Sequence, residues 1–322
     1  MVKQVIIDKG IPFLEGVFPP EIEVLHLSPE DITPESVRYA DALFVRTRTQ
    51  INKELLHGSN VRFVATATIG FDHIDQDYCR EAGIRWVSCP GCNAQAVCDY
   101  VEEAISSIKS GENALTIGIV GYGHVGKLVA QMAQRRGYKV LLSDPPLGIG
   151  MSLEQLAPLC DVLTFHTPLI REGEYPTYHL CDETILRLCK PSTLIINAAR
   201  GGVIDEQALL SCLNSLPFRE GMGVGYAIDC WENEPNINQD LLKHVDLASF
   251  HIAGYSIQGK MNASEMCLRA FCEFFSLPIL SINKKAVPLQ GDSENGWILR
   301  LTEQLKTNPA SFEQLRKQYK LR

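Results

Sequence analysis

Residues 115–144, "LTIGIVGYGHVGKLVAQMAQRRGYKVLLSD", decide the fold. An apolar strand pattern runs directly into Gly121-x-Gly123-x-x-Gly126, a helical pattern follows over 124–136, and "KVLLSD" predicts a second strand. Gly121 permits a tight turn, Gly123 lets a pyrophosphate approach the backbone, and Gly126 lets the helix pack on the strand. The stretch therefore predicts a βαβ unit that binds a dinucleotide at the N-terminus of its helix.

Asp144 ends the second strand, 18 positions after Gly126. A carboxylate in this place can accept hydrogen bonds from the adenosine ribose hydroxyls. Pro145 and Pro146 follow it, so no adjacent arginine is present to hold a 2′-phosphate. The pattern therefore predicts NAD rather than NADP, with another nucleotide, such as an S-adenosyl donor, as the alternative.

The same alternation of strands and helices extends along most of the chain. The first 88 residues predict the strands "QVIID", "EIEVLHL", "DALFVR", "VRFVATA" and "IRWVS", with helical segments between them. A second series begins at Leu115, with strands "LTIGIV", "KVLLSD", "DVLTFHT", "TLIINAA", "GVGYAID" and "DLASFH", and helices at 124–136, 152–158, 182–189 and 205–214. Such alternation predicts an α/β fold with two doubly wound parallel sheets.

A long helical pattern, "NAQAVCDYVEEAISSIKSG", lies between the two series and predicts a connector between domains. We expect the first part of a substrate-binding domain at 1–92, a Rossmann domain for NAD at 93–254, and a returning helix at 255–275 that completes the first domain. A C-terminal extension, 276–322, has amphipathic segments near "GWILRLTEQLK" and "SFEQLRKQYK". Because the first of these is apolar enough to need a partner surface, we expect the extension to form a homodimer.

Composition excludes several classes of protein. A formal net charge of −8 argues against nucleic acid as a partner. The chain has no apolar run of the about 20 residues that cross a bilayer, and its N-terminus has no apolar stretch of signal-peptide length, so we expect no membrane partner and a cytoplasmic protein. The eleven cysteines should then be thiols.

Cys89 and Cys92 form a C-x-x-C pair, which a redox dithiol or half of a zinc site could use. The sequence has no second such pair and no histidine pair at finger spacing, so we expect no metal. Cys92 should open the connecting helix, and a helix N-terminus lowers the pKa of a thiol. We therefore expect Cys92 to be more reactive than the other cysteines.

Polar residues follow three later strands, at the edge where open α/β sheets bind ligands. "IINAARGGVID" contains Arg200, "AIDCWENEP" contains Asp229 and Glu234, and "SFHIAGYS" contains His251. Each alone could be structural, as a surface ion pair, a solvated loop acid or a hydrogen-bonded histidine. Together they suit the oxidation of a 2-hydroxy acid, where a histidine takes the hydroxyl proton, a carboxylate orients it, and an arginine holds the substrate carboxylate.

At these residues the chain resembles the D-isomer-specific 2-hydroxyacid dehydrogenase family. "GIVGYGHVGKLVA", "TFHTPL", "LIINAARGGVIDEQALL", "AIDCWENEP" and "HIAGY" are similar to that family's motifs. The resemblance implies an active site in a cleft between two Rossmann-like domains, with Arg200, Glu234 and His251 as its catalytic residues. It also implies that NAD contacts Gly121, Tyr122, Gly123, His124, Val125, Asp144, Thr167, Ala198, Asp229 and Gly254, with Asp229 facing the nicotinamide carboxamide.

Finer features are similar to one branch of the family, whose substrate is a phosphorylated small hydroxy acid. They include "FVRTRTQIN", "FVATATIGFDHID", "CPGCNAQAV" and "HIAGYSIQGK", and the similarity returns weakly in "FEQLRKQY". The branch implies substrate contacts from Thr47, Thr68 and Tyr255, and a longer C-terminal extension for dimerisation than this chain has. Arg46, Arg48 and Lys260 are the candidate cations for the phosphate, and the sequence does not choose among them.

Two other functions remain open at this point. The first is a different hydroxyacid dehydrogenase of the same family, acting on phosphoglycerate, glycerate or lactate. The second is a non-catalytic NAD-sensing protein that resembles a corepressor. Such a sensor can retain all three of Arg200, Glu234 and His251, so the sequence alone does not separate the two classes.

Overall fold

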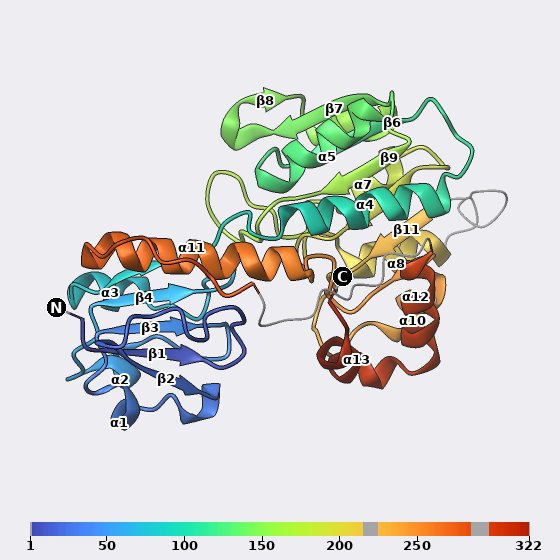
Figure 1. The fold of residues 1–322 in the computed structure, drawn as a ribbon. Helices are drawn as coiled ribbons and strands as arrows, with labels where there is room; N and C mark the ends of the chain where they lie inside the picture. The colour runs from blue at the N-terminus through green and yellow to red at the C-terminus, as the bar shows by residue number, and fades with distance from the viewer. Residues whose placement is uncertain (1, 215–224, 285–295, 322) are drawn as a thin grey trace. The chain divides into compact units, whose positions relative to one another are not determined.

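The computed structural model describes residues 2–214, 225–284 and 296–321. Part of the expected C-terminal extension, 285–295, and the first two residues of the expected strand 223–229 lie outside them. The chain divides into two compact units (Figure 1). Unit 1 comprises residues 1–93 and 256–291, and unit 2 comprises 94–255 and 292–322.

Unit 1 contains a five-stranded parallel sheet in the order β2-β1-β3-β4-β5. Its strands are β1 (Gln4–Asp8), β2 (Glu23–Leu27), β3 (Ala42–Val45), β4 (Phe63–Thr66) and β5 (Arg85–Val87). Its helices are α1 (Pro34–Val37), α2 (Lys53–Leu56), α3 (Gln76–Glu81) and α11 (Ile257–Phe275), with a 3-10 turn, η1 (Pro29–Asp31). Every residue of β3 and β4 is buried, as expected for central parallel strands covered on both faces.

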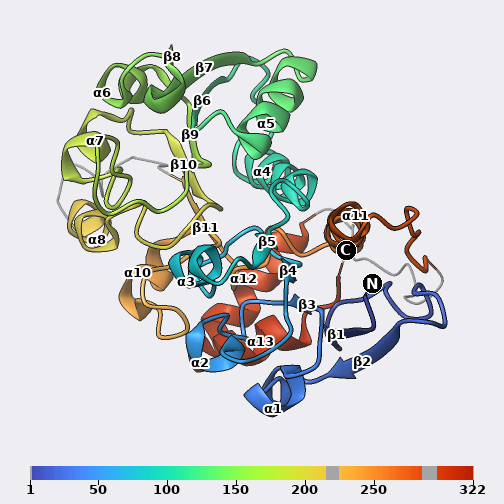
Figure 2. The ribbon, with the colours of Figure 1, turned by 90° about the vertical axis from the view of Figure 1, so that its left-hand side faces the viewer.

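Helix α11 returns from far along the sequence to cover one face of this sheet. Figure 2 shows α11 on one side of the sheet and α2 and α3 on the other. The ring of Phe271 on α11 lies 5.5 Å from that of Phe44 and 6.1 Å from that of Phe63, measured between centroids. These aromatic contacts join α11 to β3 and β4.

Unit 2 contains a seven-stranded sheet in the order β12-β11-β10-β9-β6-β7-β8. Its strands are β6 (Thr116–Val120), β7 (Lys139–Asp144), β8 (Ile149–Gly150), β9 (Val162–Phe165), β10 (Leu194–Asn197), β11 (Gly225–Ile228) and β12 (Leu247–Ala248). All pairings are parallel except that of β7 with β8. The order reverses beside β6, which is where doubly wound sheets bind nucleotides.

The helices of unit 2 cover both faces of its sheet. Figure 2 shows α4 and α5 on one side and α6, α7 and α8 on the other. The α-helices are α4 (Ala94–Ile108), α5 (His124–Arg135), α6 (Leu153–Leu156), α7 (Glu183–Leu188), α8 (Glu206–Asn214), α10 (Gln239–His244), α12 (Trp297–Thr307) and α13 (Phe312–Gln318). The 3-10 turns are η2 (Pro145–Leu147), η3 (Ala157–Leu159) and η4 (Pro309–Ser311). The predicted two-sheet α/β fold is confirmed.

Helix α12, which contains the apolar segment of the expected dimerisation region, packs within its own unit. Trp297, Ile298 and Leu305 are buried in the same hydrophobic core as the sheet. The Trp297 ring lies 5.7 Å from that of Tyr100 on α4, and Thr302 Oγ1 accepts the backbone N–H of Ala248 at 2.8 Å. The apolar face of this segment is therefore already covered, and our argument that it needs a second copy was wrong.

All eleven cysteines are free thiols, and ten of them are buried. Burial raises the pKa of the Cys92 thiol to about 12, so the expectation of a reactive Cys92 is also wrong. The side chain is 8% exposed, and its desolvation outweighs the effect of the nearby helix N-terminus. Among the described residues, no histidine, cysteine and carboxylate side chains form a group suited to a metal ion, and no helix combines the length and apolar character needed to cross a bilayer.

Candidate active site

Six parallel strands of unit 2 end at one edge of its sheet. A predicted cofactor or catalytic residue lies at the end of each strand or within three positions of it: Gly121 after β6, Asp144 at the end of β7, Thr167 after β9, Arg200 after β10, Asp229 after β11 and His251 after β12. The carboxyl ends of parallel strands lie side by side, so the fold brings the predicted NAD contacts and the predicted catalytic residues to the same edge of the sheet.

The glycine-rich turn has little room where its glycines pack and open space where a ligand is expected. Gly121 has a φ of 93°, and a Cβ atom there would lie 2.8 Å from the carbonyl oxygen of His166. A Cβ atom on Gly126 would lie 2.0 Å from the carbonyl oxygen of Gly121. At Gly123, however, a Cβ atom would meet nothing within 4 Å. The turn thus leaves space at the glycine that the fingerprint assigns to the pyrophosphate.

Asp144 supports this turn as well as ending β7. Its Oδ2 accepts the backbone N–H of Tyr122 at 2.6 Å, and its Oδ1 accepts that of Leu147 at 3.2 Å. Each carboxylate oxygen has two lone pairs, so both oxygens can still accept a ribose hydroxyl. The contact with Tyr122 explains how one residue can fix the turn and also face the nucleotide.

The residues present fit a dinucleotide. Thr167 Oγ1 is buried with no hydrogen-bond partner among the described residues, and such a group costs free energy unless a ligand pairs with it. An open position at Gly123 and an unpaired hydroxyl at Thr167 are what a bound NAD would use. The other predicted contacts lie on the same loops: Tyr122, His124 and Val125 around the start of α5, Ala198 after β10, and Gly254 beyond His251.

Glu234 and His251 form the central pair of the site. Glu234 Oε2 lies 2.8 Å from Nδ1 of His251, and Glu234 Oε1 accepts the backbone N–H of Trp231 at 2.9 Å. With Nδ1 held by the carboxylate, the imidazole is oriented, and its Nε2 has no partner in the described part of the chain. A histidine bound in this way can exchange a proton through Nε2.

Asp229 shapes the loop that holds His251. Its Oδ1 accepts Ser249 Oγ at 2.6 Å and the N–H of Ile252 at 2.8 Å, while its Oδ2 accepts the N–H of Ala253 at 2.9 Å. His251 has a φ of 59°, a left-handed conformation that a non-glycine residue adopts only when its surroundings enforce it. Asp229 therefore has a structural task beyond its predicted contact with the nicotinamide carboxamide.

Arg200 lies on a loop that is tied to its neighbour. The buried Asn197 donates from Nδ2 to the carbonyl oxygens of Arg200 and Cys230, both at 3.0 Å. This links the turn after β10 to the turn after β11. The guanidinium itself donates from one terminal nitrogen to the carbonyl oxygen of Ala199 at 2.8 Å. The other N–H groups of the guanidinium fork suit a substrate carboxylate.

Two further acidic residues, Glu206 and Glu232, are joined by a hydrogen bond next to the loop that contains Glu234. The sequence analysis did not single them out. Glu206 Oε1 accepts the backbone N–H of Glu232 at 2.6 Å, and Glu232 Oε1 lies 2.7 Å from Nε2 of His179. Burial, with smaller contributions from the charges of Glu232 and Glu234, raises the pKa of Glu206 to about 8. Glu206 is thus protonated at neutral pH.

In unit 1 the predicted substrate residues follow β3 and β4. Thr47 lies in the loop after β3, and Thr68 lies two residues beyond β4. Thr68 Oγ1 donates to the carbonyl oxygen of Gly70 at 2.9 Å and lies 2.7 Å from Thr66 Oγ1, which is 3.0 Å from His73 Nε2. This chain of hydroxyls fixes the position of Thr68 within its unit.

The candidate cations of unit 1 differ in their partners. Arg46 donates from Nε and from a terminal nitrogen to the two oxygens of the buried Asp8, both at 2.8 Å. Arg48 also has an interaction partner. Lys260, in the first turns of α11, has no carboxylate partner among the described residues, and burial together with the charge of Arg46 lowers its pKa. Within the described ranges, Lys260 is therefore a cation without a counterion.

Tyr255 contacts a residue that the sequence analysis did not single out. Arg316 on α13 donates from Nε to the Tyr255 hydroxyl at 3.1 Å, and one of its terminal nitrogens lies 4.0 Å from Glu234 Oε2. The only signal in the sequence was the weak similarity of "FEQLRKQY", which contains this arginine.

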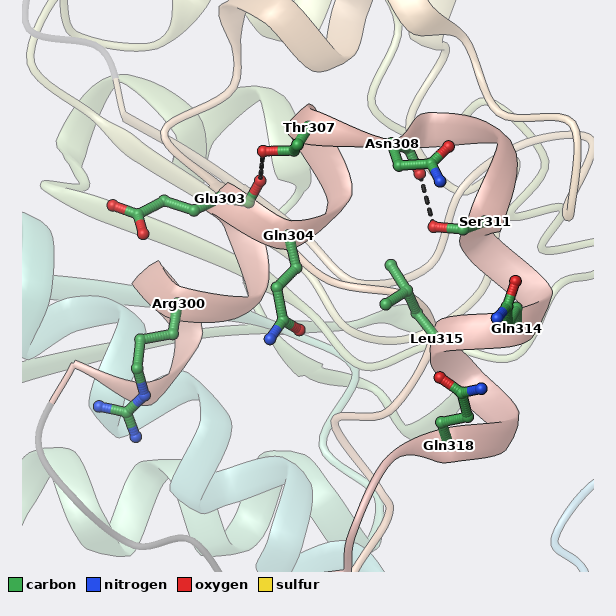
Figure 3. Close-up of a pocket in the computed structure, with 9 residues that line it drawn as sticks. All are labelled: Arg300, Glu303, Gln304, Thr307, Asn308, Ser311, Gln314, Leu315 and Gln318. Atoms are coloured by element: carbon green, nitrogen blue, oxygen red, sulfur yellow. Dashed lines mark hydrogen bonds between the residues drawn. The ribbon is translucent and has the colours of Figure 1, made fainter.

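A groove of about 620 Å³ lies between α12 and α13. It is lined by Arg300, Glu303, Gln304, Thr307, Asn308, Ser311, Gln314, Leu315 and Gln318 (Figure 3). None of these residues belongs to the predicted site. Four of the lining residues carry side-chain amides, and the groove has no feature that hydride transfer would use.

Comparison with known proteins agrees with this geometry. Residues 102–253 match the family model for the D-isomer specific 2-hydroxyacid dehydrogenase, NAD binding domain. The erythronate-4-phosphate dehydrogenase of Bacteroides fragilis is 42% identical over 99% of this chain and 96% of its own length. That of Escherichia coli is 39% identical over 84% of this chain and 73% of its own. NAD⁺-bound 3-phosphoglycerate dehydrogenase of Entamoeba histolytica shares the fold, with a TM-score of 0.70 and 23% identity over 86% of this chain and 96% of its own.

Proposed function

The chain belongs to the D-isomer-specific 2-hydroxyacid dehydrogenase family, in its erythronate-4-phosphate dehydrogenase branch, and we propose that it oxidises 4-phospho-D-erythronate at C2. The product is 2-oxo-3-hydroxy-4-phosphobutanoate, and the reaction is a step in pyridoxal 5′-phosphate biosynthesis. The observation that supports this most directly is the 2.8 Å pair of Glu234 and His251 at the same sheet edge as the NAD turn.

His251 acts as the base. Its Nε2 accepts the proton of the C2 hydroxyl as the carbonyl forms. A bound NAD would supply the hydride acceptor for this oxidation. The imidazolium that results is stabilised by the carboxylate of Glu234 on Nδ1, which also fixes the ring tautomer. Arg200 holds the substrate carboxylate and polarises the forming carbonyl. In the reverse direction His251 returns the proton.

Thr47, Thr68 and Tyr255 contact the substrate in this proposal, and Lys260 binds its phosphate. The charge of Arg46 is already balanced by Asp8, and Arg48 has a partner of its own. Lys260 is half-buried and has no carboxylate partner in the part of the chain that the structure describes, and the dianion of a phosphate monoester would balance its charge. The chemistry therefore favours Lys260 over the two arginines.

The test is NADH production, followed by fluorescence, across 4-phosphoerythronate, erythronate, 3-phosphoglycerate, glycerate and lactate. We expect a kcat/KM at least about 100-fold higher for 4-phosphoerythronate than for erythronate, and a loss of about 10² to 10⁴ in kcat for His251→Ala. His244→Ala, an exposed histidine of the same unit, is the control. Equal turnover with and without the phosphate would contradict the substrate, and tight NADH binding without turnover of any acid would favour the sensor.

Two broader features belong to the same proposal. Eleven free thiols support a reducing compartment, so the enzyme works in the cytoplasm. Resemblance to its branch supports a homodimer, although α12 buries its own apolar face. Sedimentation velocity at micromolar concentration tests the dimer, and a single monomeric species would contradict it.

A further inference from the structure

The C-terminal helix α13 brings one cation to the acid–base pair. Arg316 lies with a terminal nitrogen 4.0 Å from Glu234 Oε2, and that same oxygen lies 2.8 Å from Nδ1 of His251. One carboxylate oxygen therefore lies between a guanidinium and the imidazole. The guanidinium also covers the ring of Tyr255, with its central carbon 5.8 Å from the ring centroid.

The packing of α13 fixes this position. Phe312, at the start of the helix, is 1% exposed and belongs to the core of unit 2. Tyr319, just beyond the helix, lies 6.0 Å from the Phe250 ring and 6.5 Å from the Tyr255 ring. Arg316 lies between these two anchors, and its side chain is 29% exposed. The arginine is thus held at the site by buried aromatic contacts.

We propose that Arg316 is a positioning residue that acts through Glu234 and Tyr255 and opposes proton uptake by His251. This inference rests on the proposed function for the roles of those two residues. A fixed cation near a histidine makes the imidazolium less favourable, because like charges repel. The same cation favours the carboxylate form of Glu234. The repulsion favours the neutral His251 that accepts the proton during oxidation, while the carboxylate of Glu234 orients the ring and stabilises the imidazolium that then forms.

Several other charged or titratable groups lie near this pair, and none of those described duplicates the contact that Arg316 makes. Glu206 and Cys230 are coupled to Glu234 by charge, and Tyr255 and Glu313 are coupled to Arg316. Arg200 and Asp229 are coupled to Cys230, and Glu232 is coupled to Glu206. Glu206 is protonated at neutral pH. The carboxylate of Asp229 already accepts the backbone N–H groups of Ile252 and Ala253. Arg200 is the other cation in this set, and its role is to hold the substrate. Removing Arg316 therefore changes the charge beside Glu234, and no other described cation makes contact with that carboxylate.

The experiment compares Arg316→Gln with Lys317→Gln. Lys317 is the next residue of α13 and lies 3.7 Å from Glu313, and Arg316 lies 3.9 Å from the same residue. Lys317→Gln therefore removes a cation from the same helix with the same ion-pair partner, and it serves as the control. For each full-length protein, the His251 imidazole is titrated by NMR, with His251→Ala to assign its signal among the eight histidines. The pH dependence of kcat/KM for 4-phosphoerythronate is then measured on the same proteins.

We expect Arg316→Gln to move the titration midpoint of His251 and the acidic limb of the rate profile to higher pH by about half a unit to one unit. Arg316→Lys should move them less, and Lys317→Gln should leave both unchanged. An unmoved midpoint in Arg316→Gln would overturn the proposal. A raised KM with an unmoved midpoint would also overturn it, in favour of a direct substrate contact.

Two further outcomes are informative. If the wild type does not turn over 4-phosphoerythronate but the NMR midpoint moves, the proposed function fails and the role of Arg316 stands. If Arg316→Gln does not fold, Tyr255→Phe releases the guanidinium from its hydrogen-bonded anchor and tests the same midpoint. An unmoved midpoint in Tyr255→Phe would then count against the proposal.

Discussion

A Cβ atom on Gly201 would lie 1.9 Å from the carbonyl oxygen of Trp231. Gly201 follows the predicted substrate-binding Arg200, and Trp231 donates its backbone N–H to Glu234. The two loops that contain Arg200 and Glu234 therefore touch, backbone to backbone, where any side chain would push them apart. Their contact sets the relative position of the arginine and the acid–base pair within unit 2.

Gly201→Ala should impair both stability and catalysis. Because the blocking atom is a backbone oxygen, the loops must shift to accept the methyl group, at a cost of about 1 to 3 kcal/mol in the free energy of unfolding. The displaced Arg200 and Glu234 should lower kcat by about 10². Urea denaturation and steady-state kinetics measure the two effects. Gln207→Ala, at an exposed position of α8, is the control. A Gly201→Ala protein with wild-type kcat would contradict the coupling.

Gly123→Ala should separate cofactor binding from stability. A methyl group at this position meets no protein atom within 4 Å, so we expect the free energy of unfolding without ligand to fall by about 1 kcal/mol or less, the cost of a poorer helix N-cap. The methyl group would occupy the space that the fingerprint assigns to the pyrophosphate, so the Kd for NADH should rise at least about tenfold.

Fluorescence titration with NADH and a thermal melt without ligand measure these two quantities. Gly126→Ala is the matched contrast, since its Cβ would lie 2.0 Å from the carbonyl oxygen of Gly121 and should lower the Tm. Unchanged NADH affinity in Gly123→Ala would place the cofactor elsewhere.

Lys260→Met should weaken recognition of the substrate phosphate. Methionine keeps an unbranched apolar side chain of similar size and removes the charge. We expect KM for 4-phosphoerythronate to rise about 10- to 100-fold, the loss of one charge-assisted contact, with kcat/KM for unphosphorylated erythronate unchanged. Inorganic phosphate should also cease to inhibit competitively. Lys53→Met, an exposed lysine of the same unit, is the control. Equal losses for the two substrates would show that Lys260 does not contact the phosphate.

The fold and most of the sheet-edge residues could be predicted because their signals are local. The glycine fingerprint, the apolar strands and the carboxylate at the end of β7 can each be recognised from a few consecutive residues. The alternation of strands and helices then indicates the fold class. The expected helix at 124–136 is observed at His124–Arg135, and the expected one at 182–189 at Glu183–Leu188. The carboxyl ends of parallel strands then gather the polar residues without further information.

What the sequence could not supply depends on burial and on contacts far along the chain. Arg316 contacts Tyr255 across 61 residues, and nothing near either residue indicates the other. The expectation for Cys92 relied on a helix N-terminus, but the thiol is desolvated, and that effect is larger. The apolar segment of α12 was assigned to a second copy because its partner surface, formed by α4 and β12, lies elsewhere in the sequence.

Glu206→Gln should stabilise the protein at alkaline pH and have no effect in mild acid. The folded-state pKa of Glu206 is raised to about 8, mainly by burial, so the folded protein keeps this proton while the unfolded chain releases it above about pH 4.5. Near pH 4 Glu206 is protonated in both the folded and the unfolded state. The wild type and Glu206→Gln should then have the same free energy of unfolding. As pH rises toward 8, the unfolded state becomes progressively more favourable, and the wild type loses stability until the folded state also ionises.

Glutamine retains the oxygen that accepts the N–H of Glu232 and has no proton to lose. We therefore expect Glu206→Gln to match the wild type near pH 4 and to exceed it by on the order of 2 to 4 kcal/mol in the free energy of unfolding at pH 8. Urea denaturation across this range measures the difference, with the exposed Glu21→Gln as control. A difference that stays constant with pH would mean that Glu206 does not keep its proton in the folded protein, and it would contradict this prediction.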